Sequence, residues 1–175
     1  MFISCIERYE PSAELEKIDP KKEVATEVIM TYTDSAKLKF KIVTPKLETY
    51  REDDKLIEEY PEGLDIEFYN DQKDVVSSIN AEYARRISKD GVMILREYVE
   101  LTNAEGDQLV TRGITWNEIE HTLETTKFVE LIKVATRDTF FGFGFYAKDD
   151  FSRFRITDMK GKRRYRNLSE EFGAE

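Results

Sequence analysis

Apolar and polar residues alternate along most of this chain, and this period of two constrains its fold more than any other feature. Residues 37–42 read KLKFKI and residues 64–69 read LDIEFY. Successive side chains of a β-strand point to opposite faces of a sheet, so each segment predicts a strand with one apolar and one polar face. Lys89-Asp90-Gly91 is the clearest turn between such segments, because glycine accepts the positive φ of a tight turn. The pattern therefore predicts antiparallel hairpins.

Strands of this kind account for most of the chain. Ile79, Ala81 and Tyr83 are expected to share one face of a strand, and Pro45 is expected to mark a strand end or a bulge. Further strands are expected at 24–34, 107–118, 121–134, 138–147 and 150–158, and a polar connection with a turn at its end is expected at 51–63. Many strands with short turns indicate an all-β sandwich, roll or open barrel. The expected organisation is a polar N-terminal anchor or tether at 1–23, a β-domain at 24–161 and a charged tail at 162–175.

A faint internal repeat supports stacked hairpins. The segment EYVEL at 97–101 recurs as KFVEL at 127–131, and Tyr83, Trp116 and Tyr146 precede turns at a similar spacing. A fixed period with one aromatic residue in each unit is typical of hairpins that bury their faces on their neighbours.

Composition argues against several classes of function. The net charge of −9 disfavours nucleic acid as the main partner, because phosphate contacts require clustered lysine and arginine. The sequence has one cysteine, Cys5, and one histidine, His121, which disfavours a disulfide, a zinc site or a Cys–His catalytic pair. His121 is expected in an exposed turn, and no metal or cofactor is expected. We therefore predict a protein that is not an enzyme.

Two local features have more than one interpretation. Gly142 and Gly144 alternate with three phenylalanines, so one face of that strand is bare and allows a neighbouring layer or an acyl chain to approach closely. A basic cluster follows the last expected strand and is either a solvated tail or a site for a phosphorylated ligand or an acidic partner. It comprises Lys160, Lys162, Arg163, Arg164 and Arg166.

Several segments in order resemble one family. They are TYTDS at 31–35, YPEGL at 60–64 with FYN at 68–70, SINAEY at 78–83, and GFYA at 144–147 followed by Asp150 and Phe151. In sequence and spacing, residues 24–161 resemble the LptC family of lipopolysaccharide-export proteins. The resemblance implies an elongated, twisted antiparallel β-roll, β-jellyroll-like and open at both ends.

The resemblance also implies a non-catalytic function in lipid transfer. Such a protein takes lipopolysaccharide from an inner-membrane ABC transporter and passes it along an apolar groove to a periplasmic bridge protein, which it joins by edge-strand pairing. Relatives carry an N-terminal transmembrane helix, whereas here Phe2-Ile3-Ser4-Cys5 is similar to the end of a lipoprotein signal. This implies a periplasmic protein anchored to the inner membrane through lipidated Cys5. The expected groove residues are Leu38, Phe40, Ile42, Ile66, Phe68, Ile79, Tyr83, Val99, Trp116, Val129 and Phe143.

Two alternatives remain open at this point. The first is a structural or carbohydrate-binding β-sandwich of the cell envelope with a closed core and no lipid role. The second is a hydrolase with paired carboxylates, which the placement of acidic residues on the polar strand faces disfavours.

Overall fold

The computed structural model describes residues 21–151 and 153–164, and nearly all of them form one antiparallel sheet of ten strands. Cys5, most of the expected tether and the tail from residue 165 lie outside the described residues. The strands are β1 (Glu23–Asp34), β2 (Lys37–Glu52), β3 (Lys55–Tyr60), β4 (Leu64–Tyr69), β5 (Val75–Ile87), β6 (Val92–Asn103), β7 (Gln108–Asn117), β8 (Thr122–Lys133), β9 (Asp138–Lys148) and β10 (Phe154–Arg164). The prediction of an all-β, twisted antiparallel roll is confirmed.

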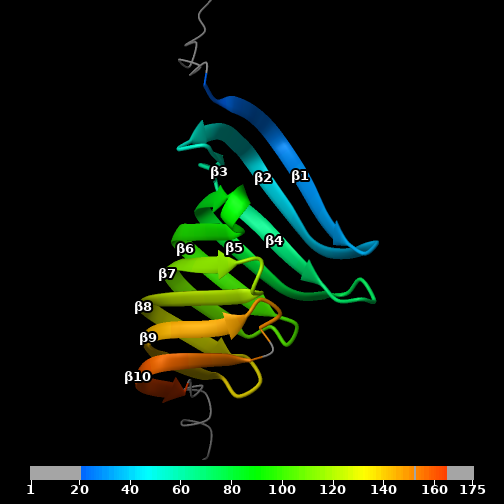
Figure 1. Ribbon diagram of the computed structural model, residues 1–175. Coiled ribbons are helices and arrows are strands. Elements are labelled where there is room, and N and C mark those ends of the chain that lie inside the picture. The colour runs from blue at the N-terminus through cyan, green and yellow to red at the C-terminus, as the bar shows by residue number, and fades with distance from the viewer. Residues whose placement is uncertain (1–20, 152, 165–175) are drawn as a thin grey trace, which may run out of the picture.

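Neighbouring strands in the sequence are mostly neighbours in the sheet. The order is β1-β2-β3-β5-β6-β7-β8-β9-β10, and β4 pairs with both β2 and β5 beside β3. Among the described strands β1 pairs only with β2 and β10 only with β9, so these two strands form the edges of the sheet. Figure 1 shows β1 at one end of the long axis and β10 at the other.

A line of β-bulges bends the sheet over on itself. The strand register shifts near residues 82, 97, 113, 126 and 160, which lie on β5, β6, β7, β8 and β10. Glu97 has a φ of 72° and Gly144 a φ of 75°, which places both in the left-handed region that bulges use. Each long strand therefore crosses a bend, and Figure 1 shows β6 to β10 wrapping around one side of the molecule.

The bend produces two layers that face each other across one core. Side chains from strands that are not neighbours in the sheet meet there, as Phe68 of β4 and Trp116 of β7 do with ring centroids 5.0 Å apart. Lys133 of β8 likewise lies over the ring of Phe154 of β10 at 5.7 Å. The buried apolar residues of both layers form one continuous cluster.

Three details differ from the sequence expectations, each for a local reason. Strand β3 occupies part of the segment that was expected to be a polar connection. Strands β3 and β4 both pair with β2, and a turn closed by Gly63 separates them. Pro45 lies inside β2, where β2 changes partner between these two strands and no ladder bond from Pro45 is required. The basic residues Lys160, Lys162, Arg163 and Arg164 belong to β10, because the last strand extends to residue 164.

A candidate ligand-binding interior

A row of directly opposed apolar residues runs along the inner face of one layer. Each residue of the row is the register partner of the next one on the adjacent strand. The row consists of Met30, Ile42, Ile66, Ile79, Leu101, Leu109, Leu131 and Phe140. Cross-strand partners on one face lie about 4.5–5.5 Å apart, so this row is an apolar stripe that crosses eight strands from β1 to β9.

The facing layer contributes a second row. Met93, Trp116, Leu123, Ala147 and Phe154 are register partners on β6 to β10. Trp116 is 1% exposed, and its ring makes edge contacts with both Phe40 and Phe68, each at 5.0 Å between centroids. The indole Nε1 of Trp116 has no hydrogen-bond partner within the part of the chain that the structure describes. The tryptophan therefore holds the two layers together by ring packing alone.

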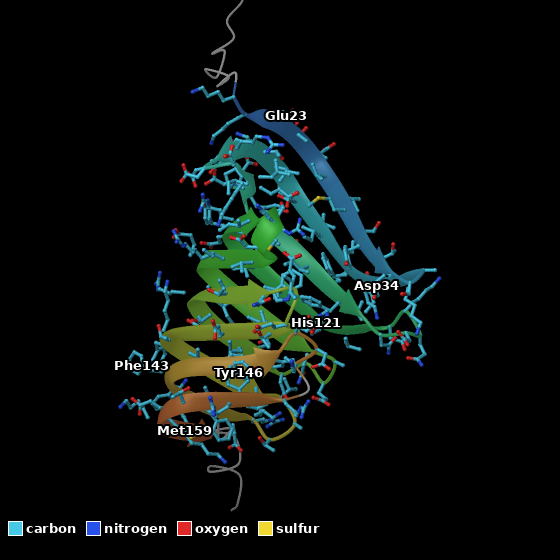
Figure 2. The ribbon with its side chains drawn as sticks, viewed as in Figure 1. Glu23, Asp34, His121, Phe143, Tyr146 and Met159 are labelled. Carbon is cyan, nitrogen blue, oxygen red and sulfur yellow. The ribbon has the colours of Figure 1, made fainter. Side chains whose placement is uncertain are left out.

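A cavity opens between the layers at the side away from the bend. Its volume is about 610 Å³, within the range of small-molecule sites. Phe40, Phe68 and Val76 line it from one layer, and Ile119 and His121 line it from turns of the other. Figure 2 shows His121 at these turns and Asp34 at the far tip of β1.

Charged groups surround the mouth of this side cavity. The Arg86 guanidinium donates two hydrogen bonds to the Glu118 carboxylate at 2.6 and 2.8 Å and one to Glu58 at 2.6 Å. The hydrogen bonds to Glu118, followed by those to Glu58, hold the pKa of Arg86 above its usual range despite its burial. His121 Nδ1 lies 2.8 Å from an Asp149 carboxylate oxygen, and the Ser77 hydroxyl donates to the Asp149 carbonyl at 2.6 Å. The Ser77 hydrogen bond joins the two layers at their open side.

A second cavity lies at the β10 end of the interior. Its volume is about 510 Å³, and its lining includes Leu131, Phe140, Phe154 and Met159. The first two are the last members of the apolar row. Phe154 is 40% exposed and Met159 is 55% exposed, so apolar surface reaches solvent here. The row therefore runs from near the side cavity to an opening at the end of the roll.

The structure brings most of the expected groove residues together inside the roll. Seven are buried in the common core, namely Ile42, Ile66, Phe68, Ile79, Val99, Trp116 and Val129. Phe40 packs against them from the cavity, and Leu38 is half-buried nearer the hairpin end of β2. Their burial shows a filled core beside the side cavity rather than an empty channel through the whole roll.

Two expected groove residues lie elsewhere. The register shifts between Ala81 and Tyr83, so Ala84 continues the buried face and Tyr83 lies opposite the exposed Arg96. The expectation that Tyr83 shares a face with Ile79 is therefore wrong, because a bulge moves every later side chain to the other face. The Tyr83 hydroxyl donates to Glu59, and burial together with this hydrogen bond raises the pKa of Tyr83 to about 12.

Phe143 is the other residue outside the interior. Its ring is 45% exposed and packs edge-on against Phe128 at 5.5 Å, on the outer surface of the bend. The bare face at Gly142 instead accommodates the backbone of β10, since a Cβ there would lie 2.9 Å from Met159 Cα. Of the two interpretations of this glycine, close packing of a neighbouring strand is the one observed.

The sequence analysis missed much of the apolar row, including Leu109, Leu131 and Phe140. Each lies in a segment of alternating apolar and polar residues, which indicates that it faces the interior. Choosing these residues as members of one row, however, requires knowing which residues are paired across six or more strands. The repeated segments at 97–101 and 127–131 do occupy equivalent places: Val99 and Val129 are both buried directly after the bend, and Tyr98 and Phe128 are both exposed.

Other kinds of site are not evident in the described part of the chain. No cluster of three or more metal-ligating side chains occurs among residues 21–151 and 153–164. Within the same residues no helix is long and apolar enough to cross a membrane. Comparison of the sequence with protein-family models and with curated proteins returned no match.

Proposed function

We propose that this protein is a non-catalytic carrier that binds the acyl chains of lipopolysaccharide inside its β-roll and passes them along the apolar row. In this proposal it receives the lipid from an inner-membrane ABC transporter and delivers it to a bridge protein of similar architecture in the periplasm. Anchoring to the inner membrane through a lipidated Cys5 is part of the same proposal.

The observation that carries the proposal is the apolar row that leads from the side cavity toward the end cavity. Phe40 and Phe68 line the first cavity and pack on the core, and Leu131 and Phe140 line the second. A closed β-sandwich would bury its core with no apolar opening at either place. Burial of an acyl chain contributes about 0.8 kcal/mol per CH₂ group, so a chain that enters the side cavity has ample driving force.

The composition of the side cavity suits an amphipathic ligand. The apolar rings lie toward the core, and the charged residues that line the same cavity carry both signs, namely Lys39, Lys89, Arg86, Asp34, Glu118, Asp149 and Asp150. Acyl chains can enter between the layers while an anionic head group stays outside the cavity in solvent. Burial of the acyl chains then supplies the driving force without favourable charge, so a protein of net charge −9 can bind an anionic lipid.

The two edges of the sheet suit end-to-end joining. Exposed edge strands carry unpaired backbone groups that add a strand from a partner. The sequence of β1 contains three acidic residues and no basic residue, whereas that of β10 contains five basic residues and one acidic residue. Opposite charge favours pairing of a β10 edge with an acidic, β1-like edge of the next roll and disfavours pairing of like edges.

Site-specific photo-crosslinking tests the proposal. A photoreactive phenylalanine analogue at position 40 or 68 is expected to crosslink to lipopolysaccharide. The same analogue at position 143, an aromatic site on the outer face, is the matched control and is expected not to crosslink. Equal crosslinking at 143 and 40, or none at 40 and 68 in a folded protein, would contradict lipid binding between the layers.

A further inference from the structure

A depression of about 670 Å³ lies on the outer surface of the roll. It is on the outer face of the layer whose inner face carries Met93, Trp116 and Leu123. Its rim is built from one cross-strand row, in which each residue is the register partner of the next: Ile94, Thr115, Glu124, Tyr146 and Arg155. The row crosses five strands, from β6 to β10. At about 4.8 Å per strand it spans about 19 Å, the extent of a short oligomer rather than of a single small molecule.

A glycine on β7 makes room for a lysine side chain in the depression. Gly113 is the register partner of Arg96 on β6 and contributes no side chain to the floor. The Lys127 amine occupies the space over Gly113, where a Cβ would lie 2.7 Å from Nζ. This amine donates a hydrogen bond to the Arg112 carbonyl at 3.1 Å. The depression also lies at a bulge, because the register of β7 against β8 is interrupted between Thr111 and Thr115.

The charge of the depression is opposite to that of the protein. Arg96, Lys127 and Arg155 line it together with a single carboxylate, that of Glu124. Neither arginine has an ion-pair partner among residues 21–151 and 153–164, whereas Arg85, Arg86 and Arg163 are paired with carboxylates. Two guanidinium groups at opposite sides of one hollow are donors that suit carboxylate or phosphate groups.

The remaining groups favour a carbohydrate. The Tyr146 side chain is 40% exposed, and Figure 2 places it midway along the face of the roll that is turned toward the viewer. An exposed aromatic ring offers an apolar face to the C–H face of a sugar. Hydroxyl groups of Thr115, Thr126 and Thr157 and the Glu124 carboxylate can exchange hydrogen bonds with sugar hydroxyls. The Glu124 carboxylate in the rim disfavours a phosphodiester chain, which has few donors to offer it.

We propose that this outer depression is a binding site for a short acidic oligosaccharide, with Arg96 and Arg155 binding its acidic groups and Tyr146 stacking on one sugar. The site is separate from the lipid-binding interior and does not depend on the proposed function. It would attach the roll to a charged glycan of its surroundings while the interior stays accessible.

Titration calorimetry with trigalacturonic acid, with neutral maltotriose as the comparison, tests this site. Trigalacturonic acid is expected to bind and maltotriose to bind at least about tenfold more weakly, since charge-assisted hydrogen bonds supply the difference. R96Q and R155Q are each expected to weaken trigalacturonic acid about tenfold. Tyr146→Thr is expected to weaken both sugars.

The matched control is Arg137→Gln, which alters an exposed arginine in the turn after β8 and is expected to leave binding unchanged. The proposal is overturned if trigalacturonic acid does not bind, if R96Q and R155Q bind it like the parent protein, or if maltotriose binds equally well. Tighter binding of an eight-residue oligouridylate, lost in the same variants, would also overturn it and assign the depression to single-stranded nucleic acid. Lipid crosslinking at Phe40 is expected to be unaffected by R96Q and R155Q, so failure of one proposal is distinguishable from failure of the other.

Discussion

The Arg86 cluster at the mouth of the side cavity gives the sharpest stability prediction. The side chains of Arg86, Glu58 and Glu118 are only 20%, 15% and 12% exposed. Replacing Arg86 with alanine leaves two poorly solvated carboxylates without their shared cation. Removing one partner of a buried ion pair costs about 3–5 kcal/mol, because the remaining charge keeps its desolvation penalty.

This magnitude is large for a protein of this size. The free energy of unfolding of a single domain is about 5–15 kcal/mol, so Arg86→Ala is expected to remove a large part of it. For a domain near 150 residues it should lower the melting temperature by on the order of 10 °C. Urea denaturation followed by circular dichroism measures the first quantity and a thermal scan the second.

Neighbouring residues provide the controls for Arg86. Arg85 pairs with Glu52 at the surface, where the Glu52 side chain is 55% exposed, and Arg85→Ala is expected to cost less than about 1 kcal/mol. The triple variant Arg86→Met, Glu58→Gln, Glu118→Gln removes the unpaired charges and should recover most of the stability. If Arg86→Ala costs no more than Arg85→Ala, or if the triple variant is no more stable than Arg86→Ala, the two carboxylates do not depend on Arg86 for their stability.

Three further stability predictions follow from individual residues. The buried Tyr60 hydroxyl has no hydrogen-bond partner among the described residues, so Tyr60→Phe should be neutral or stabilise the protein by up to about 1 kcal/mol in urea denaturation; a clear loss would indicate an unrecognised partner. Gly142→Ala should cost about 3 kcal/mol because its Cβ would collide with the backbone of β10. Gly106→Ala, at a φ of 81° with its nearest neighbour Val134 in ordinary contact at 3.9 Å, should cost about 1 kcal/mol; equal losses would contradict this. Burial opposes ionisation of Asp107, but hydrogen bonds from Lys133, a backbone N–H and an asparagine hold its pKa below the ordinary value of 3.8. The ionised Asp107 carboxylate therefore contributes fully to stability above about pH 4, and this contribution is lost as pH falls through the folded-state pKa. Asp107→Asn should cost about 1–3 kcal/mol at pH 7 and less at pH 3. A loss that does not depend on pH would show that the charge is unimportant.

The alternation of apolar and polar residues was sufficient to predict the fold, because most strands between the two edges of the sheet have one buried face. It predicted β4 at its observed bounds and β1, β7, β8 and β9 to within one residue at each end, whereas it placed the last strand at 150–158 and β10 is Phe154–Arg164. It missed β3, where Glu58 and Glu59 interrupt the apolar positions and the Arg86 contact that neutralises Glu58 comes from β5. That contact is not visible in the local sequence.

The candidate site was predictable only in part. Ile42, Ile66 and Ile79 lie in regular segments, and their inward orientation follows from the period of two. Tyr83 follows a bulge, which inverts the alternation without an obvious sequence signal. Phe40 and Phe68 contact Trp116 only because the sheet folds over at the bend. The alternation within single strands therefore could not predict these contacts.

Quenching of Trp116 fluorescence by a brominated acyl chain is the most direct test of acyl-chain binding between the layers. Trp116 is the only tryptophan in the sequence, so its fluorescence reports on one place between the layers. Bromine atoms on an acyl chain quench tryptophan on contact, and dibromostearate is therefore expected to quench Trp116 strongly, whereas unbrominated stearate binds without quenching. Binding of both lipids with the same small change in emission would place the acyl chain outside the roll and contradict the proposed carrier function.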